Sequence, residues 1–221
     1  CFKMKKILFL IHDLGQGGAE KVLVNLVNNM DPTKFDISVT ALFGGGVNER
    51  FLAPHIHYRT VFPKAIRGNS HFMKLLPPKQ LHKMYIKDRY DIEVSYLEGP
   101  SARIISGCPY KDTKLISWIH VEQHTMKKLA ASFRNEKEAR ACYTRFHQTV
   151  CVSEYVKNDF CSILGFKKPC CVLYNTVESS KILEMSKEDT LEMYPIGKEC
   201  KIRSIQVHGE DKEKCYAGQR V

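Results

Sequence analysis

Three glycines near the start of the chain have the spacing of a phosphate-binding turn. Gly15, Gly17 and Gly18 follow the apolar run at residues 7–11 and precede residues 19–30, where apolar side chains recur at helical spacing. Backbone N–H groups at a helix start are unpaired and lie at the positive end of the helix dipole. The pattern therefore predicts a strand, a glycine turn and a helix that together seat an anion or a phosphate. A turn that binds no ligand is the alternative.

The same stretch differs from the fingerprint of dinucleotide-binding proteins. Glu20 stands where that fingerprint has a Gly or Ala that packs the helix on the strand. The second predicted strand, residues 35–43, runs into three glycines and supplies no carboxylate for a ribose. The sequence therefore disfavours NAD as a ligand, and the turn has no Walker lysine.

Three polar residues follow later apolar runs that predict strands. They are His120, Glu98 and Ser153. Because the carboxyl ends of parallel strands meet at one edge of a sheet, we expect His120 to lie at the same edge as the glycine turn. A strand-end histidine that donates to a carbonyl is the simpler interpretation of His120. Glu98 is either a solvated or capping carboxylate or an acceptor ligand, and Ser153 is either a helix N-cap or a cleft residue.

The elements that position these residues alternate between strand and helix. We expect strands at residues 7–11, 35–43, 57–62, 91–96, 114–119, 148–152 and 169–174. We expect helices at residues 19–30, 47–52, 79–87, 100–105, 133–146 and 154–164, and a short one ending near residue 188. Short crossovers between such units predict an α/β fold with a Rossmann-like, doubly wound parallel sheet.

The composition is that of a folded, basic protein. The chain has 221 residues, 43% of them hydrophobic, which is enough for one substantial core. A net charge of +10 predicts attraction to phosphates, nucleic acid or an acidic membrane face. Since no aromatic residues are interleaved with the basic ones, we expect no nucleic-acid partner. The local basic excess between residues 64 and 89 indicates a solvated surface or, alternatively, peripheral contact with an anionic membrane through an exposed apolar and basic turn at residues 72–76.

The cysteines indicate neither disulfides nor a metal site. There are nine, but no CxxC pair exists and no histidine spacing completes a zinc finger, so we expect buried reduced thiols and no metal. No apolar run approaches the roughly 20 residues of a membrane span. We therefore expect a cytoplasmic protein that can lie peripherally at the inner membrane face.

Five motifs, in their order and spacing, carry a resemblance over residues 5–190. They are KKILFLIHDLGQGGAE, DIEVSYLEGPSA, KLISWIH, VCVSEYVKNDF and VLYNTVE. The sequence resembles the retaining glycosyltransferases of family 4, whose GT-B architecture has two Rossmann-like domains. The resemblance implies that this chain is the amino-terminal, acceptor-binding domain and that the other domain holds most of the donor.

The resemblance also implies a reaction and residue roles. A UDP- or GDP-sugar is the donor substrate, a polysaccharide or lipid-linked sugar is the acceptor, and no cofactor is needed. Gly17 and Gly18 would lie against the donor diphosphate and the transferred sugar, Glu20 would brace their loop, and His120 would face the reacting sugar. Glu98 and Ser153 are acceptor-side candidates. Retention in the family is usually explained by attack from the face that the diphosphate leaves.

The chain departs from the family beyond its first domain. We expect an acceptor-side domain at residues 4–177, a linker helix region at 178–197, and an irregular tail at 198–221 in place of a second domain. A premature stop, a shifted reading frame or a deliberate fragment would each produce such a tail. A catalytically inactive binding module is therefore the alternative function, and a Rossmann-type oxidoreductase is a third.

Overall fold

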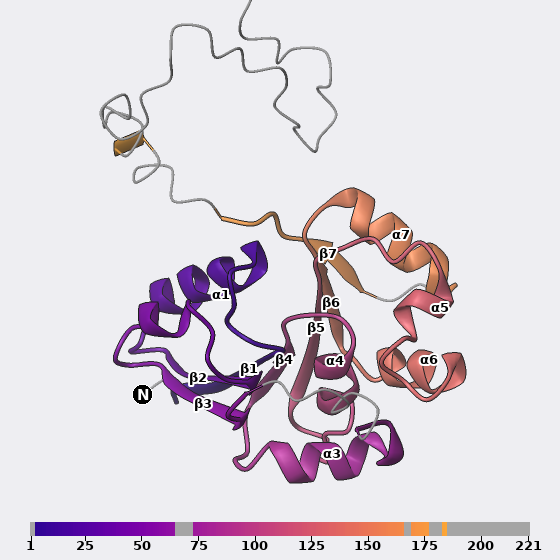
Figure 1. The fold of residues 1–221 in the computed structure, drawn as a ribbon, viewed down its shortest axis with the longest axis horizontal. Helices are drawn as coiled ribbons and strands as arrows, with labels where there is room; N and C mark the ends of the chain where they lie inside the picture. The colour runs from indigo at the N-terminus through magenta and orange to yellow at the C-terminus, as the bar shows by residue number, and fades with distance from the viewer. Residues whose placement is uncertain (1–2, 65–72, 166–168, 177–182, 185–221) are drawn as a thin grey trace, which may run out of the picture. The chain divides into compact units, whose positions relative to one another are not determined.

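Seven strands form one parallel sheet in the order β3-β2-β1-β4-β5-β6-β7 (Figure 1). The computed structural model describes residues 3–64, 73–165, 169–176, 183 and 184. The chain divides into Cys1–Thr176 and Val177–Val221, so all seven strands belong to the first unit. The predicted linker and tail lie outside the described residues, except for Leu183 and Glu184.

The bounds of the elements follow the sequence pattern closely. The strands are β1 (Lys5–Ile11), β2 (Phe35–Phe43), β3 (His57–Phe62), β4 (Ile92–Ser95), β5 (Lys114–Ile119), β6 (Gln148–Cys151) and β7 (Cys170–Val172). The helices are α1 (Gly18–Asn29), the 3₁₀ turn η1 (Glu49–Phe51), α3 (Pro78–Tyr85), α4 (Pro100–Ile105), α5 (Met126–Leu129), α6 (Glu136–Thr144) and α7 (Glu154–Leu164). The predicted α/β fold with a Rossmann-like parallel sheet is confirmed.

The strand order reverses at β1. In register, Ile7 of β1 pairs with Ile37 of β2 on one side and with Ile92 of β4 on the other. The first three strands extend the sheet in one direction from β1, and β4 to β7 extend it in the other. Ligands of open α/β sheets bind beyond the carboxyl ends of the strands at such a reversal, so the loops after β1 and β4 are the place to look for a site.

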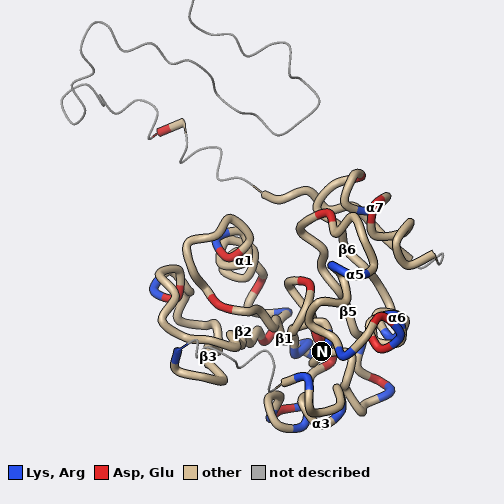
Figure 2. Tube along the Cα trace, turned by 45° about the vertical axis from the view of Figure 1, so that its right-hand side comes forward, with Lys and Arg blue, Asp and Glu red and all other residues tan. Residues whose placement is uncertain are grey.

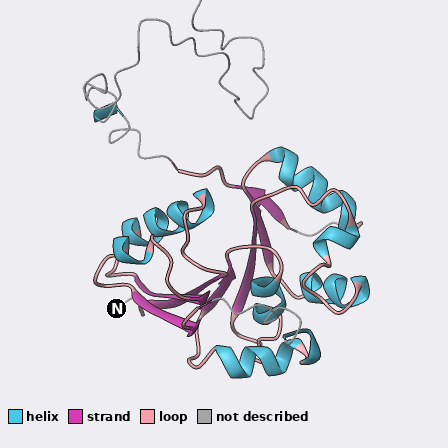
Figure 3. Cartoon of the chain, in the orientation of Figure 1, coloured by secondary structure: helices cyan, strands magenta, loops and turns pink. Residues whose placement is uncertain are grey.

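Successive side chains of the strands lie on opposite faces of the sheet, and each face packs into its own hydrophobic core (Figure 3). Phe9 packs with Leu23 and Val27 of α1 on one face. Leu8 and its neighbours on the other face pack with residues from α3 to α7. Both faces of β1 are therefore covered, which explains why its sequence is an unbroken apolar run without alternation.

The helix ends agree with the capping residues in the sequence. The Ser153 hydroxyl accepts a hydrogen bond from the Val156 N–H at 3.2 Å, which makes Ser153 the N-cap of α7. Gly165 ends the same helix with a φ of 64°, in the left-handed region that favours glycine. Pro100 is the first residue of α4, where a missing N–H costs nothing.

The predicted helix at residues 133–146 starts later than expected. The Asn135 side chain accepts from the Glu138 N–H at 2.8 Å and so caps α6. Phe133 lies before the cap and is buried in the core instead of on the helix. The short helix α5, with Thr125 as its N-cap, occupies part of the chain before it and was not foreseen. Local capping by Asn135 outweighed the apolar periodicity on which the prediction was based.

The prediction of an exposed apolar turn at residues 72–76 is wrong for Met73. Its side chain is buried in the core, whereas Leu75 is 72% exposed and Phe72 lies outside the described residues. The Arg103 guanidinium explains this placement, because it donates to the Met73 and Leu76 carbonyls, at 2.7 Å in each case. These bonds hold the turn against α4.

Arg103 is itself a buried cation that needs an anion. Its Nε donates to Glu138 Oε2 at 3.0 Å, and the guanidinium is only 1% exposed. Burial raises the pKa of Glu138, but hydrogen bonds from Arg103 and Arg134 outweigh this effect and lower the pKa from 4.5 to about 2. The pair ties α4 to α6 beneath the sheet.

Glu138→Gln is expected to destabilise the fold by about 3 to 5 kcal/mol at pH 7, because it leaves a buried arginine without its counter-charge. A carboxylate whose pKa is lowered on folding stabilises above its unfolded pKa and loses that effect as the pH falls through its folded pKa. The difference from wild type should thus be full above pH 4.5 and shrink toward pH 2. Urea unfolding across this range measures it. Glu136→Gln, an exposed change in the same helical turn, is the control, and an equal loss for both variants would contradict the assignment.

Candidate functional site

The turn after β1 leaves its helix start open. Gly17 is the N-cap of α1 with an extended backbone, and no side chain caps the helix. Gly17 and Gly18 are both exposed. A Cβ built on Gly18 would meet nothing within 4 Å, so the space in front of this residue is free. The start of α1 is therefore uncapped by side chains and has free space beside Gly18, as an anion seat requires.

Glu20 folds back over this turn. A Cβ on Gly17 would collide with the carboxylate of Glu20, so these two residues are in direct contact. A larger residue at position 17 would displace the Glu20 carboxylate. Glu20 thus lies where it can brace the turn.

Two residues that the sequence analysis did not single out hold the turn in place. The Asp13 carboxylate accepts from the Gly15 N–H at 2.7 Å and contacts His12 Nδ1 at 2.6 Å. The Asn48 amide side chain donates to the Gly15 carbonyl, and its backbone N–H donates to the Leu14 carbonyl at 2.9 Å. Asp13 has a local signal, since Asp two residues before a turn amide is a common turn former. Asn48 has none, because it comes from beyond β2.

Glu98 lies in the loop after β4 and holds the loop after β5. Its Oε1 accepts from the His120 N–H at 2.5 Å and from the Val121 N–H at 2.9 Å. Burial raises the pKa of the Glu98 carboxyl, and the two amide bonds oppose that shift. Glu98 is thus the capping carboxylate of one earlier alternative and not a solvated one. Its role as an acceptor ligand stays a prediction.

The His120 ring packs among aromatic side chains at the end of β5. Its centroid lies 4.8 Å from that of Tyr96 and 6.3 Å from that of Trp118. Burial lowers the pKa of His120 from 6.5 to about 4, and a hydrogen bond with the Tyr96 backbone opposes the shift only in part. The imidazole is therefore neutral at pH 7. Its Nε2 is buried and has no hydrogen-bond partner among the described residues.

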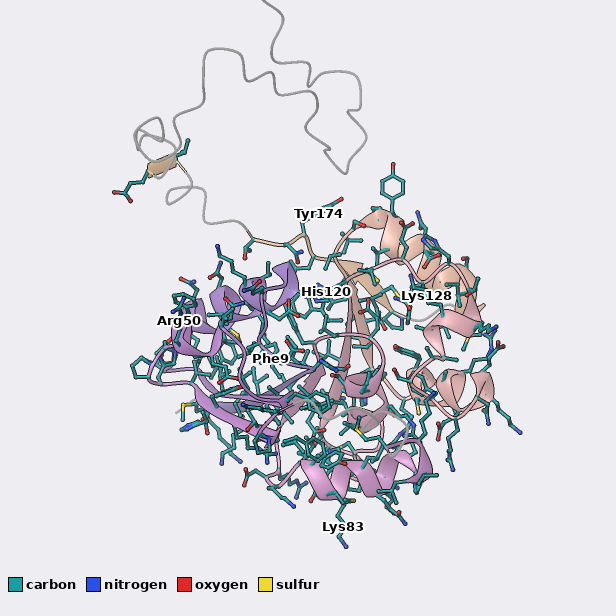
Figure 4. The ribbon with its side chains drawn as sticks, in the orientation of Figure 1. Phe9, Arg50, Lys83, His120, Lys128 and Tyr174 are labelled. Atoms are coloured by element: carbon teal, nitrogen blue, oxygen red, sulfur yellow. The ribbon has the colours of Figure 1, made fainter. Side chains whose placement is uncertain are left out.

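Tyr96 connects the histidine to the glycine turn. Its side chain is fully buried on the α1 face of the sheet, and burial raises the pKa of its hydroxyl, with the charge of Glu20 adding to the shift. The Tyr96 ring is thus in contact with His120. Because β1, β4 and β5 are parallel, the structure brings the glycine turn and His120 to the same edge of the sheet (Figure 4).

The described residues leave three polar atoms unpaired in this cluster. They are the Tyr96 hydroxyl, Trp118 Nε1 and His120 Nε2. Buried polar atoms normally have a hydrogen-bond partner. Three unpaired polar atoms close together therefore indicate a place where a polar ligand binds. Tyr96 and Trp118 were missed in the sequence because each ends an apolar run, where an aromatic residue is expected simply to fill the core. Ser153 stands apart from this cluster in function, since its hydroxyl serves the α7 cap.

Comparison with known proteins gives a family and a fold. The sequence model described as Glycosyltransferase Family 4 matches residues 16–181. No curated protein matches the chain in sequence. Among solved structures, the apo form of the lipopolysaccharide outer core galactosyltransferase WaaB is similar, with a TM-score of 0.52 and 18% identity. That match covers 78% of this chain and 46% of WaaB.

Two further structures have the same fold. Anabaena HepE in complex with UDP-glucose has a TM-score of 0.52 at 17% identity over 82% of this chain and 50% of its own. The trehalose-6-phosphate phosphatase N-terminal domain from Candida albicans has a TM-score of 0.57 at 11% identity, with 86% of this chain and 54% of its own covered. The chain thus spans about half the length of these proteins, as one half of a GT-B architecture does. With the family model matching most of its residues, the chain belongs to glycosyltransferase family 4.

Proposed function

We propose that this chain is the acceptor-binding amino-terminal domain of a retaining glycosyltransferase that uses a UDP- or GDP-sugar. The observation that carries the proposal is the cluster at the strand reversal, where an uncapped glycine turn and an unpaired imidazole nitrogen meet through Tyr96. The amides after Gly17 suit the donor diphosphate. The unpaired polar atoms of Tyr96, Trp118 and His120 suit the hydroxyl groups of a sugar.

His120 is a neutral group in the free domain in this scheme. If its Nδ1–H is directed to the Tyr96 backbone, the lone pair of Nε2 accepts a hydrogen bond from a sugar hydroxyl. A donor diphosphate brings negative charge to the same edge and raises the pKa of the imidazole, which can then take up a proton from solvent. As the bond between sugar and phosphate breaks, the attacking acceptor hydroxyl gives its proton to the leaving phosphate, and the imidazolium stabilises the remaining charge.

The comparisons support the donor class. The HepE structure contains UDP-glucose, and HepE shares the fold of this chain. Family membership removes the oxidoreductase alternative. The inactive binding module remains the second candidate for the isolated chain, because the chain spans about half the length of its structural relatives. Either way, the acceptor proposed here is a polysaccharide or a lipid-linked sugar.

The surface of α3 supports contact with an anionic membrane. The helix contains Lys79 and Lys83 but no carboxylate, and the exposed Lys87 follows it in the chain. Basic segments are visible along α3 in Figure 2. Lys83 points outward on the side of the first unit away from His120 (Figure 4). Leu75 and Met84 add exposed apolar side chains, at 72% and 45%. None of the described helices has the length and apolarity to span a bilayer. We infer a peripheral, cytoplasmic-face contact through this basic surface.

The chain should bind UDP or GDP weakly and NAD not at all. The glycine turn offers amides to a diphosphate, but the β2 end offers no ribose carboxylate, and the partner domain holds most of the donor. Calorimetric titration of the chain with UDP, GDP and NAD tests this expectation, with amide chemical shifts at Gly17 and Gly18 locating the site. Tight NAD binding would contradict the proposed function.

In a full-length family member with the same residues, Gly17→Val and His120→Ala should each lower sugar transfer by at least roughly tenfold without unfolding the protein. The first displaces Glu20 from the turn and the second removes the imidazole. Initial rates with radiolabelled donor measure the effect. Glu122→Ala, an exposed change in the loop that follows His120, is the control. Unchanged turnover in both site variants would remove these residues from the site.

Exchange of the α3 lysines for glutamate should abolish vesicle binding. The triple variant Lys79→Glu, Lys83→Glu, Lys87→Glu reverses the charge of the surface, with about 1 kcal/mol lost for each basic contact. Co-sedimentation with phosphatidylglycerol vesicles and with phosphatidylcholine vesicles measures binding. The control is Lys21→Glu, Lys127→Glu, Lys137→Glu, which makes the same charge change at exposed positions elsewhere. An equal loss of vesicle binding in the control would show that the effect comes from net charge alone.

A further inference from the structure

Three potential metal ligands converge in the core on the other face of the sheet. They are His82 of α3, Glu93 of β4 and Cys108 in the segment after α4. His82 Nε2 lies 2.8 Å from Glu93 Oε2, and Cys108 Sγ lies 3.5 Å from Glu93 Oε1. One ligand atom from each residue lies within 4.8 Å of the other two. All three side chains are buried, with Glu93 and Cys108 fully inaccessible.

The charge of the buried Glu93 carboxylate is compensated only in part by its neighbours. The carboxylate lies in mid-sheet, and within the described residues its ion-pair partner is His82. A buried carboxylate is costly unless it is paired with a cation or coordinates a metal. Burial raises the pKa of the Cys108 thiol to about 11, and the charge of Glu93 adds to the shift. The Glu93 carboxylate is therefore buried with one imidazole and one neutral thiol as its polar partners.

We propose that His82, Glu93 and Cys108 bind a zinc ion. Imidazole nitrogen, carboxylate oxygen and thiolate sulfur are the three ligand types that zinc takes in proteins. Bonds of about 2.0 to 2.3 Å in tetrahedral geometry place such ligand atoms about 3.3 to 3.5 Å apart. The separation of Cys108 Sγ and Glu93 Oε1 is 3.5 Å, whereas His82 Nε2 lies 2.8 Å from the other carboxylate oxygen, Oε2. Because one ligand atom from each residue already lies within 4.8 Å of the other two, small side-chain shifts bring the three to such separations.

The charges balance when zinc binds. The Cys108 thiol releases its proton to solvent and becomes a thiolate. Thiolate, carboxylate and Zn²⁺ then sum to zero, with the His82 imidazole as a neutral ligand. The ion replaces the weak thiol-to-carboxylate hydrogen bond with two coordinate bonds.

Access and support for the ion are both present. His82 also lines a pocket of about 340 Å³, whose other walls include Ile86, Pro109 and Tyr110, so an ion can approach the cluster from the His82 side. Lys79, Lys83 and Lys87 at its mouth are exposed and therefore screened by solvent. The residue before Cys108, Gly107, packs directly on the Pro78 backbone at the start of α3. The elements that carry the ligands are thus already in contact.

This site is independent of the proposed transfer site. Glu93 faces α3 and α4, whereas Tyr96 and His120 lie on the α1 side. The ligands are 11 and 15 residues apart and come from three elements, which is why no CxxC or zinc-finger spacing marks them. Bound zinc would fasten the crossover helix α3 to β4 and to the segment before β5.

The test uses the purified, untagged chain after dialysis against a chelator. Titration with Co²⁺ should give one equivalent of binding, with a sulfur-to-cobalt charge-transfer band in the near ultraviolet and strong visible bands of tetrahedral Co²⁺. Zn²⁺ should displace it and raise the melting temperature. Cys108→Ser should lose the near-ultraviolet band and weaken zinc binding by more than about 100-fold, beyond what loss of an outer-sphere partner costs.

Controls separate this site from other thiols and from misfolding. Cys142→Ser removes another buried thiol, and the double variant Cys161→Ser, Cys170→Ser removes a pair whose sulfurs lie 3.6 Å apart. Both should keep the band. In chelator, Cys108→Ser should melt like the chelated wild type, which shows that it folds. Absence of stoichiometric cobalt or zinc, a band that survives in Cys108→Ser, or a band lost in either control would overturn the proposal.

Discussion

The parallel pairing of β1 with β2 on one side and β4 on the other is the constraint on which the rest of the structure depends. It requires β1 to be apolar on both faces, and it sends the chain outward in both directions. The loops after β1 and β4 then have no crossover between them at the carboxyl edge. The glycine turn and the Tyr96 to Glu98 loop can therefore approach the same space.

Within that space, contacts between loops set the geometry of the site. Glu98 binds two amides of the loop after β5, and Asn48 binds the turn after β1 from beyond β2. Each contact fixes one strand-end loop to another, so the position of His120 depends on a carboxylate that precedes it by 22 residues. The glycine turn is held both by its neighbour Asp13 and by Asn48 from beyond β2, while no side chain caps α1.

The strands and most helices could be predicted from sequence because their signals are local. Capping by Ser153, termination at Gly165 and the apolar run of β1 each act within a few residues. The burial of Met73 and the late start of α6 could not, because Arg103 and Asn135 decide them through hydrogen bonds that periodicity does not contain.

Part of the candidate site could likewise be predicted from the sequence, and part could not. The glycine turn and the placement of His120 at the strand edge follow from spacing and topology. The contributions of Tyr96 and Trp118 do not, since they depend on which atoms remain unpaired after folding, and that of Asn48 depends on a hydrogen bond to Gly15, 33 residues away. The buried cluster of His82, Glu93 and Cys108 was invisible for a further reason, because strand pairing and helix packing bring together residues that no short motif connects.

The low pKa of His120 gives the site a property that topology alone would not. A histidine with a pKa of about 4 is a neutral hydrogen-bonding group in the free domain, whereas the same ring beside a diphosphate is drawn toward the charged form. Burial destabilises the imidazolium because it removes the hydration of the charge. A phosphate charge offsets this loss only while the donor is bound. The empty domain thereby avoids an unpaired buried cation, and in the proposed function the ring can become charged only when a donor diphosphate lies beside it. Both states depend on the same aromatic enclosure by Tyr96 and Trp118, so these side chains tune the histidine as well as pack the core.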